Sequence, residues 1–230
     1  MATVPDELVD VDFTDADEPA VVDPVPVQPP LPLSVRPPIA TLARFSVADV
    51  ELMITAGVFA DGRRCELIEG LIVETMPRGL THIGCVNRLV DALNRWQLLD
   101  EMSRSGPARF CVSKEDPLSL PAQASLPEPD IMLLVGDRSR YADRRPEAAD
   151  TLLVVEVADT SLAKDKRLAA IYAAAGVPRY LLVDVNDRTM TLHEQPAAEG
   201  YAEVRDVDVV PVAVDGEELG QIDRDAVFGG

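Results

Sequence analysis

The sequence predicts a globular domain of the α/β (α+β) class, and three observations lead to this prediction. The stretch Thr151–Ala158 is a short, nearly continuous apolar run, which is typical of a strand buried on both faces of a sheet. A helical pattern after Ser161 ends at Gly176, and an apolar strand follows at Tyr180–Val185, so the three elements form a strand–helix–strand unit. Beyond Met190 the chain alternates like peripheral antiparallel strands.

Composition limits the class and the compartment. A chain of 230 residues is long enough to bury a core. It has no run of eighteen apolar residues and no signal-peptide pattern at its start, so we expect a soluble, cytoplasmic protein without a membrane partner. The three cysteines, Cys65, Cys85 and Cys111, lie far apart and form no Cys-x-x-Cys pair. This spacing argues against a disulfide framework or a zinc site, and we interpret all three as small buried residues.

The net charge of −19 argues against nucleic acid as a partner, because phosphate binding needs lysine and arginine. The distribution of charge weakens that objection. Residues 1–40 hold eight acids and one arginine, and residues 181–230 hold twelve acids and three arginines. Residues 41–180 are nearly balanced, with twenty acids and seventeen bases, so this part could present a local basic groove.

The first 40 residues carry nine of the nineteen prolines together with their acids. Such a segment cannot bury enough apolar surface to offset its ordering entropy. We expect a disordered, partly extended tail at 1–40 with an unknown partner, and a folded domain at 41–230. A proline-rich docking peptide is the alternative for the tail.

The folded part reads as alternating helices and strands. A capping box at Ser46–Asp49 begins a helix of about three turns that ends at Gly57, and Arg64–Met76 fits a hairpin. A long helix is expected at Leu80–Leu99, with His82 in its first turn either as a catalytic residue or as a local cap. Further strands are expected at Ala108–Ser113, Asp130–Val135, Met190–Glu194, Tyr201–Arg205 and Val207–Val214.

Glu156 is a carboxylate inside the apolar run, and desolvating an unpaired carboxylate is costly. It therefore needs a cation, a set of hydrogen bonds or a raised pKa, unless it lies at a sheet edge facing water. Asp130 lies at the entrance of another expected strand. If the two strands are neighbours, these acids suit Mg²⁺, which prefers one or two carboxylates together with waters and phosphate oxygens. A bound ion would offset the burial of Glu156 and lower the pKa of a water.

Five short segments carry a resemblance to a known family. They are Arg64–Gly70, Met76–His82, Glu128–Asp130, Val155–Leu162 and Tyr172–Tyr180, in that order along the chain. Together they resemble the bacterial family of "putative restriction endonucleases" within the PD-(D/E)XK nuclease superfamily. The resemblance covers about residues 41–228, and it does not extend to the acidic tail.

The resemblance implies a restriction-endonuclease-like mixed central sheet flanked by helices, with Mg²⁺ or Mn²⁺ held by carboxylates on central strands. Asp130 falls on the family's aspartate and Glu156 on its (D/E)XK acid, while Val157 would lend its backbone carbonyl to the metal. Glu66 falls on the family's early glutamate, which would extend the acidic cluster. The alternative for Glu66 is a surface strand residue paired with one of the two arginines before Cys65.

The sequence departs from this pattern at the superfamily's usual lysine, because Ala158 stands two residues after the strand glutamate. In the family a lysine from the following helix looks like the substitute, but the corresponding place holds Leu168. Lys166 is our choice for this role, and Lys164 and Arg167 are the other candidates in the first turn of that helix. If all three are only solvated residues, the catalytic competence of the chain is in doubt.

These residues lead to one expected function and one alternative. The expected function is a Mg²⁺- or Mn²⁺-dependent DNA endonuclease, in which Lys166 positions or deprotonates the attacking water. Cutting both strands of a duplex needs two sites, so we expect a homodimer by analogy. The alternative is a catalytically impaired nuclease fold that acts as a DNA- or protein-binding module. A glycosidase fits poorly, because one tryptophan and four tyrosines offer few sugar platforms.

Overall fold

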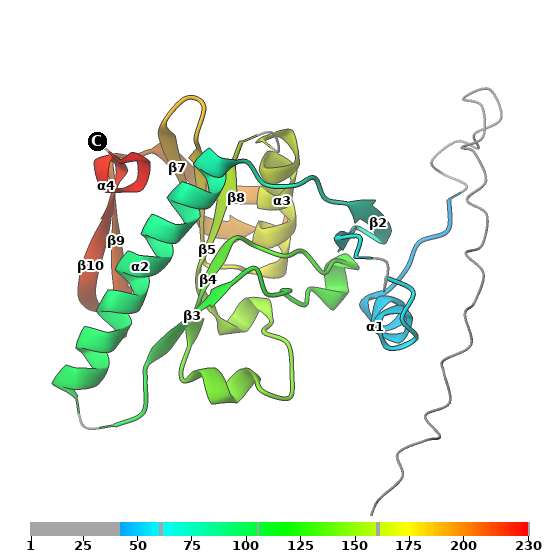
Figure 1. The fold of residues 1–230 in the computed structure, drawn as a ribbon, viewed down its shortest axis with the longest axis horizontal. Coiled ribbons are helices and arrows are strands. Elements are labelled where there is room, and N and C mark those ends of the chain that lie inside the picture. Colours follow the sequence, from blue (N-terminus) through cyan, green and yellow to red (C-terminus); the bar gives the residue numbers. More distant parts are fainter. Residues whose placement is uncertain (1–41, 60–61, 105, 160–161, 230) are drawn as a thin grey trace, which may run out of the picture. The chain divides into compact units, whose positions relative to one another are not determined.

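A mixed sheet of six strands forms the centre of the computed structural model, which describes residues 42–59, 62–104, 106–159 and 162–229 (Figure 1). In spatial order its strands are β3 (Phe110–Lys114), β4 (Ile131–Val135), β5 (Thr151–Ala158), β6 (Arg179–Asp184), β7 (Thr189–Ala197) and β8 (Gly200–Asp206). Strands β5 and β6 are parallel, and the other neighbouring pairs are antiparallel. The mixed sheet that the resemblance implied is therefore confirmed.

Strand β5 lies inside the sheet, and seven of its eight residues are buried. This burial confirms that the apolar run is a central strand and excludes the sheet-edge alternative for Glu156. Helix α3 (Leu162–Ala175) follows β5 and leads into β6, so the strand–helix–strand unit is also confirmed. Gly176 ends the helix with φ +85°, a conformation that costs glycine little.

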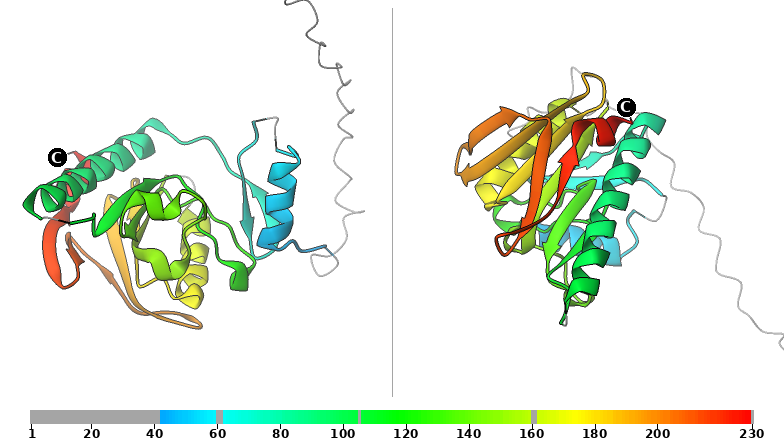
Figure 2. Two further views of the ribbon diagram at one scale, coloured as in Figure 1. Left: turned by 90° about the horizontal axis from the view of Figure 1, so that it is seen from below. Right: turned by 90° about the vertical axis from the view of Figure 1, so that its left-hand side faces the viewer.

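The two faces of the sheet carry separate cores. Helix α2 (Leu80–Ser103) covers one face, together with the strand pair β9 (Val209–Val214) and β10 (Glu217–Asp223) and the short helix α4 (Arg224–Phe228) (Figure 2). Helix α3 covers the other face, where its Leu168 and Tyr172 are fully buried. Helix α2 presents Cys85, Val86, Leu89 and Leu93 to the sheet at the three- and four-residue spacing of an apolar helix face.

The segment before α2 adds a small layer of its own. It contains α1 (Val47–Thr55), begun by the predicted Ser46–Asp49 capping box, and the predicted hairpin of β1 (Cys65–Ile68) and β2 (Leu71–Glu74). The hairpin turns at Glu69 and Gly70, with φ of +48° and +81°. A bridge from Leu67 to Leu126 connects β1 to the rest of the domain.

The expected peripheral antiparallel strands are present, because β7 and β8 form one edge of the central sheet and β9 lies in a separate antiparallel pair with β10. Other expectations needed correction. Strand β10 was not predicted, because Glu217–Asp223 is mostly polar and exposed. Helix α2 continues to Ser103, four residues beyond the expected end. Cys65 is half-buried, whereas Cys85 and Cys111 are buried as expected. In the part of the chain that the structure describes, three short 3₁₀ helices were not predicted: η3 (Pro121–Gln123), η4 (Arg138–Tyr141) and η5 (Ala148–Asp150).

The expected tail at 1–40 lies outside the described residues. Among the helices that are described, none is both long and apolar enough to cross a membrane.

Candidate active site

Asp130 and Glu156 meet because of the register between β4 and β5. Ile131 pairs with Val155 in this antiparallel ladder, so Asp130, one residue before Ile131, lies opposite Glu156. The backbone N–H of Asp130 lies 3.4 Å from Glu156 Oε2. Residues that face each other across an antiparallel pair point their side chains to the same face. Two acids 26 residues apart are thus brought to one place, at 3% and 6% exposure.

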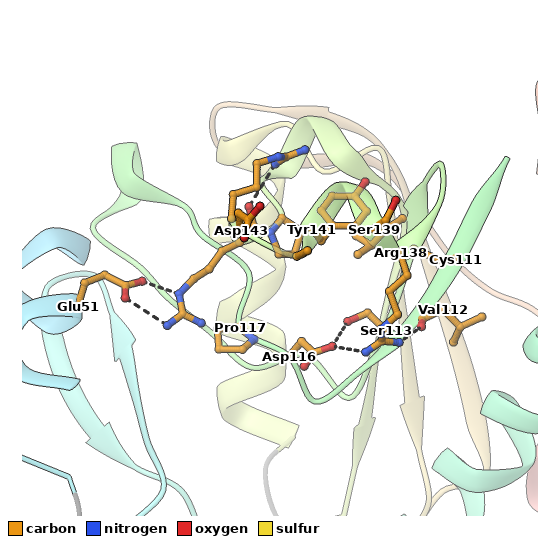
Figure 3. A pocket seen from close by; sticks show the side chains of 15 residues that line it. Glu51, Cys111, Val112, Ser113, Asp116, Pro117, Arg138, Ser139, Tyr141 and Asp143 are labelled. Atoms are coloured by element: carbon orange, nitrogen blue, oxygen red, sulfur yellow. Dashed lines mark hydrogen bonds and ion pairs between the residues drawn. The ribbon is translucent and has the colours of Figure 1, made fainter. Parts of the chain in front are cut away.

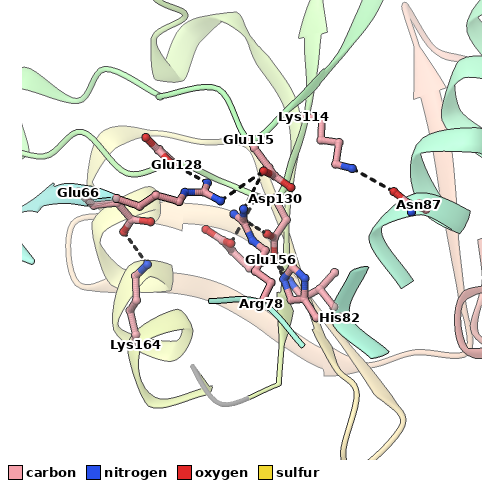
Figure 4. A network of polar contacts seen from close by, with 12 residues as sticks. Glu66, Arg78, His82, Asn87, Lys114, Glu115, Glu128, Asp130, Glu156 and Lys164 are labelled. Carbon is pink, nitrogen blue, oxygen red and sulfur yellow. Dashed lines mark hydrogen bonds and ion pairs between the residues drawn. The ribbon is translucent and has the colours of Figure 1, made fainter. Parts of the chain in front are cut away.

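Asp130 is held by three groups. Its Oδ2 accepts a hydrogen bond from the backbone N–H of Val157 at 2.8 Å and lies 3.0 Å from His82 Nε2. Its Oδ1 lies 3.1 Å from Arg78 Nη2 (Figure 4). The amide of Val157 is thus part of the site, while the expected use of its carbonyl as a metal ligand stays a prediction.

Glu156 has one oxygen fixed by a tyrosine of α3. The Tyr172 hydroxyl donates to Glu156 Oε1 at 2.8 Å, and both side chains are buried. Burial raises the pKa of Glu156 well above its ordinary value, and the nearby charges of Asp130, Asp165 and Glu66 raise it further, against the opposing effect of Lys164. This carboxyl group therefore carries its negative charge at an energetic cost that a cation would remove.

Glu66 of β1 is the third acid of the cluster. It is 5% exposed, and Lys164 Nζ lies 2.5 Å from its Oε2. Burial raises the pKa of Glu66, although Lys164 opposes this shift. Burial lowers the pKa of Lys164, but the attraction of Glu66 and Glu156 outweighs burial and leaves it above its ordinary value. Glu66 is therefore not the surface residue that was the alternative, and Lys164 is a charged partner of the cluster.

The structure places Lys164, rather than Lys166, beside the acids. Lys166 is exposed, and it makes no ion pair among the contacts of the described residues. Helical geometry explains the difference, because Lys164, Leu168 and Tyr172 are spaced four residues apart and share one face of α3. That face is buried against the sheet, whereas Lys166 points away from it.

One cavity of about 550 Å³ lies between the β1–β2 hairpin, the start of α2 and the start of α3. It is lined by the three acids and their lysine, namely Glu66, Asp130, Glu156 and Lys164. Its charged lining consists of five carboxylates, Glu66, Glu74, Asp130, Glu156 and Asp159, and four cations, Arg64, Arg78, Lys164 and Arg167. A single divalent ion would make this lining net positive. The local balance thus differs from that of the whole chain, whose net charge is −19.

The family comparison agrees with this geometry. The Uma2 family, described as "putative restriction endonuclease", matches residues 48–219. The chain belongs to this family. Among solved structures, the chain is similar to a "putative nuclease belonging to DUF820" from Anabaena variabilis ATCC 29413, with 17% identity and a TM-score of 0.57. The match covers 80% of this chain and 98% of that one, and it shows a shared fold. No protein with a curated description matches the chain.

In this Uma2 chain, sequence reasoning missed two residues of the site and left one undecided. Arg78 and Tyr172 lie inside the quoted family segments, but side-chain type alone gave neither of them a role. For His82 the sequence left a catalytic role and a local cap both open, and in the structure its Nε2 lies 3.0 Å from Asp130 Oδ2. The signal that could have found Tyr172 and Lys164 is the four-residue spacing along α3.

A larger cavity of about 840 Å³ lies beside β3 and contains none of these acids (Figure 3). Arginines line it, but each has an acidic partner. Arg145 pairs with Glu51, and Arg138 Nη2 lies 3.3 Å from Asp116 Oδ2. Because its arginines already have acidic partners and none of the buried acids lies there, we place the candidate active site in the smaller cavity.

Proposed function

We propose that this Uma2 chain is a metal-dependent DNA endonuclease whose centre is formed by Asp130, Glu156 and Glu66. The observation that carries the proposal is the convergence of these three buried carboxylates and Lys164 in one cavity. Membership of a family described as putative restriction endonucleases supports hydrolysis of phosphodiester bonds, with DNA as the substrate.

The residues fit Mg²⁺ or Mn²⁺ by their chemistry. Asp130 and Glu156 offer hard carboxylate oxygens, and the raised pKa of Glu156 reflects a buried charge that lacks compensation. Within the described residues, no group of three or more histidine, cysteine, aspartate or glutamate side chains is arranged to hold a metal ion. Mg²⁺ does not need such a group, because it commonly takes one or two carboxylates and completes its shell with water and phosphate oxygens.

Each residue then has a distinct task. Asp130 and Glu156 would hold the ion, which when bound supplies Lewis-acid chemistry toward a water and the phosphate. Val157 N–H and His82 fix the orientation of Asp130, and the Tyr172 hydroxyl fixes Glu156. These contacts leave fewer rotamers to the two acids, so the site is preorganised.

Lys164 takes the role that the sequence assigned to Lys166. Its ammonium is held by Glu66 and is attracted by Glu156, so it would orient the attacking water and stabilise negative charge on the phosphate. Arg64 and Arg167 on the cavity lining would contact the flanking phosphates. Cutting both strands of a duplex requires two such sites, and the expected homodimer remains part of the proposal.

A plasmid-cleavage assay tests the proposal. Purified full-length protein should nick or linearise supercoiled DNA with Mg²⁺ or Mn²⁺ and should lose this activity in EDTA. Asp130→Asn and Glu156→Gln should bring cleavage to background. Glu199→Gln, which removes the same charge from an exposed turn between β7 and β8, should cleave like the wild type. Intact plasmid with both metals, or equal cleavage by Asp130→Asn, would refute the proposal.

One observation favours the alternative of a non-catalytic binding module. Both carboxylate oxygens of Asp130 already have protein partners, namely Arg78 on Oδ1 and His82 with Val157 N–H on Oδ2. A module of this kind would bind DNA or protein without a divalent ion. Titration calorimetry separates the two functions, because only the nuclease has a metal site that Asp130→Asn removes.

A further inference from the structure

Arg78 occupies a special position at the entrance of α2. Its Nη2 lies 3.1 Å from Asp130 Oδ1 and its Nη1 lies 2.7 Å from Glu115 Oε2, so one guanidinium bridges two carboxylates. The side chain is 19% exposed, at the edge of the cavity. Gly79 follows, and a Cβ at that position would lie 2.5 Å from Asp159 Oδ2. The main chain beside Arg78 therefore lies close to the side chain of Asp159.

The oxygen that Arg78 contacts is the one a metal ion would need. Asp130 Oδ2 is taken by Val157 N–H and His82 Nε2, so Oδ1 is the oxygen left for an added cation. A guanidinium and a divalent ion cannot both bind one carboxylate oxygen closely, because their positive charges would lie a few ångströms apart in a partly buried site.

We propose that Arg78 is the built-in counter-cation of the acidic site and competes directly with the divalent ion for Asp130 Oδ1. The inference rests on the proposed metal-dependent function and adds that Arg78 regulates the binding of the ion. Without the ion, Arg78 neutralises Asp130; with the ion, Arg78 leaves Asp130 and keeps Glu115 as its partner. The concentration of ion needed to load the site is thus set partly by Arg78.

Glu115 is placed to receive the displaced arginine. It follows β3 with φ +56°, a left-handed conformation that is unfavourable for a glutamate and tends to occur at functional positions. Its Oε2 also lies 3.6 Å from Arg64 Nη1, and Arg64 Nη2 in turn lies 3.0 Å from Glu128 Oε2. Negative and positive side chains thus alternate along a row that runs from Asp130 through Arg78, Glu115 and Arg64 to Glu128. Arg78 therefore keeps Glu115 as a carboxylate partner after it leaves Asp130.

Mn²⁺ binding to purified full-length protein, measured by isothermal titration calorimetry without DNA, tests the inference. Arg78→Ala should bind Mn²⁺ about tenfold more tightly than the wild type, or tighter still, because the ion no longer has to break the ion pair between Arg78 and Asp130. Arg78→Lys should remain closer to the wild type. Arg64→Ala is the matched control, because it removes the same charge from the same row without touching Asp130, and it should change the affinity by no more than about threefold.

A second readout distinguishes direct competition from a general change of charge. Added guanidinium chloride should weaken Mn²⁺ binding to Arg78→Ala more than an equal concentration of sodium chloride does, because the free ion refills the vacated place. In the wild type the two salts should act alike. Arg78→Gln replaces the alanine variant if circular dichroism shows that the latter is unfolded.

The possible results separate this inference from the proposed function. Equal tightening in Arg78→Ala and Arg64→Ala would overturn direct competition, and so would unchanged or weaker binding in Arg78→Ala. If Asp130→Asn abolishes Mn²⁺ binding while Arg78→Ala has no effect, only the inference fails. If neither the wild type nor Arg78→Ala binds Mn²⁺, the proposed metal-dependent function fails as well.

Discussion

Removing the Tyr172 hydroxyl should destabilise the protein by an amount that grows with pH. The hydroxyl donates to Glu156 Oε1 at 2.8 Å, and Tyr172 is fully buried. Tyr172→Phe deletes one oxygen and leaves the ring in place, so the lost hydrogen bond dominates the effect. A bond to a neutral acceptor contributes about 0.5–1.5 kcal/mol, and one to a charged acceptor about 1.5–3 kcal/mol. The loss should therefore be about 1 kcal/mol where Glu156 is protonated and about 2 kcal/mol or more where it is ionised.

The direction of the pH effect follows from the pKa of Glu156. Burial, followed by the charges of Asp130, Asp165 and Glu66, raises this pKa in the folded state. The stability that Glu156 contributes is thus fully present below its unfolded pKa and is lost as pH rises through its folded pKa. Burial also raises the pKa of Tyr172 well above its ordinary value, so its hydroxyl keeps its proton and remains a donor in alkaline solution.

Urea unfolding followed by circular dichroism, in EDTA and from acidic to alkaline pH, measures this effect. The matched control is Tyr180→Phe, because Tyr180 is equally buried but donates to the neutral backbone carbonyl of Asp165 at 3.0 Å. Its cost should be nearly independent of pH. If Tyr172→Phe costs the same as the control at every pH, Tyr172 does not bind an ionised Glu156 and the electrostatic reasoning is refuted.

Three further predictions concern the site and the core. Glu156→Gln should flatten the fall of thermal stability with rising pH in EDTA, because it removes the carboxyl group whose folded pKa is raised; circular dichroism melts will show this. Lys164→Met should abolish plasmid cleavage, whereas Lys166→Met should retain it, because only Lys164 contacts the acidic cluster. Gly220→Ala should lower the free energy of unfolding by about 1–3 kcal/mol, measured with urea, because its Cβ would lie 2.2 Å from Trp96 Cε2.

Each of these predictions has an outcome that contradicts it. An unchanged pH profile for Glu156→Gln would place the raised pKa on another group. Equal cleavage by the Lys164 and Lys166 variants would leave the cluster without a catalytic lysine. Gly106→Ala is the control for Gly220→Ala, because a Cβ at Gly106 meets no atom within 4 Å, and equal stability of the two variants would exclude close packing under Trp96.

The central strands of the fold could be predicted because their sequence is mostly apolar. Strand β5 has the predicted bounds, because an apolar run buried on both faces stands out from the polar residues on either side of it. Strand β10 was missed for the opposite reason. Its residues, from Glu217 to Asp223, are mostly polar and exposed, and only Ile222 is buried.

The sequence itself pointed to Asp130 and Glu156, and the family resemblance added Glu66, but the proximity of these acids depends on a register that composition does not reveal. Asp130 meets Glu156 because β4 and β5 pair antiparallel with Ile131 opposite Val155. Position along the helix favoured Lys166, whereas the lysine that lies beside the acids in the structure is Lys164. The face of α3 decides the matter, and Lys164 lies two turns before Tyr172 on that face. Arg78 could not be assigned, because an arginine before a helix is usually a solvated residue.

A crystal structure with Mn²⁺ would test the central claim most directly, because anomalous scattering locates the ion without reference to activity. We predict a peak at bonding distance, about 2 Å, from carboxylate oxygens of both Asp130 and Glu156, with the Arg78 guanidinium no longer on Asp130. A saturated crystal that shows no peak there, with Arg78 still bound to Asp130, would contradict the account.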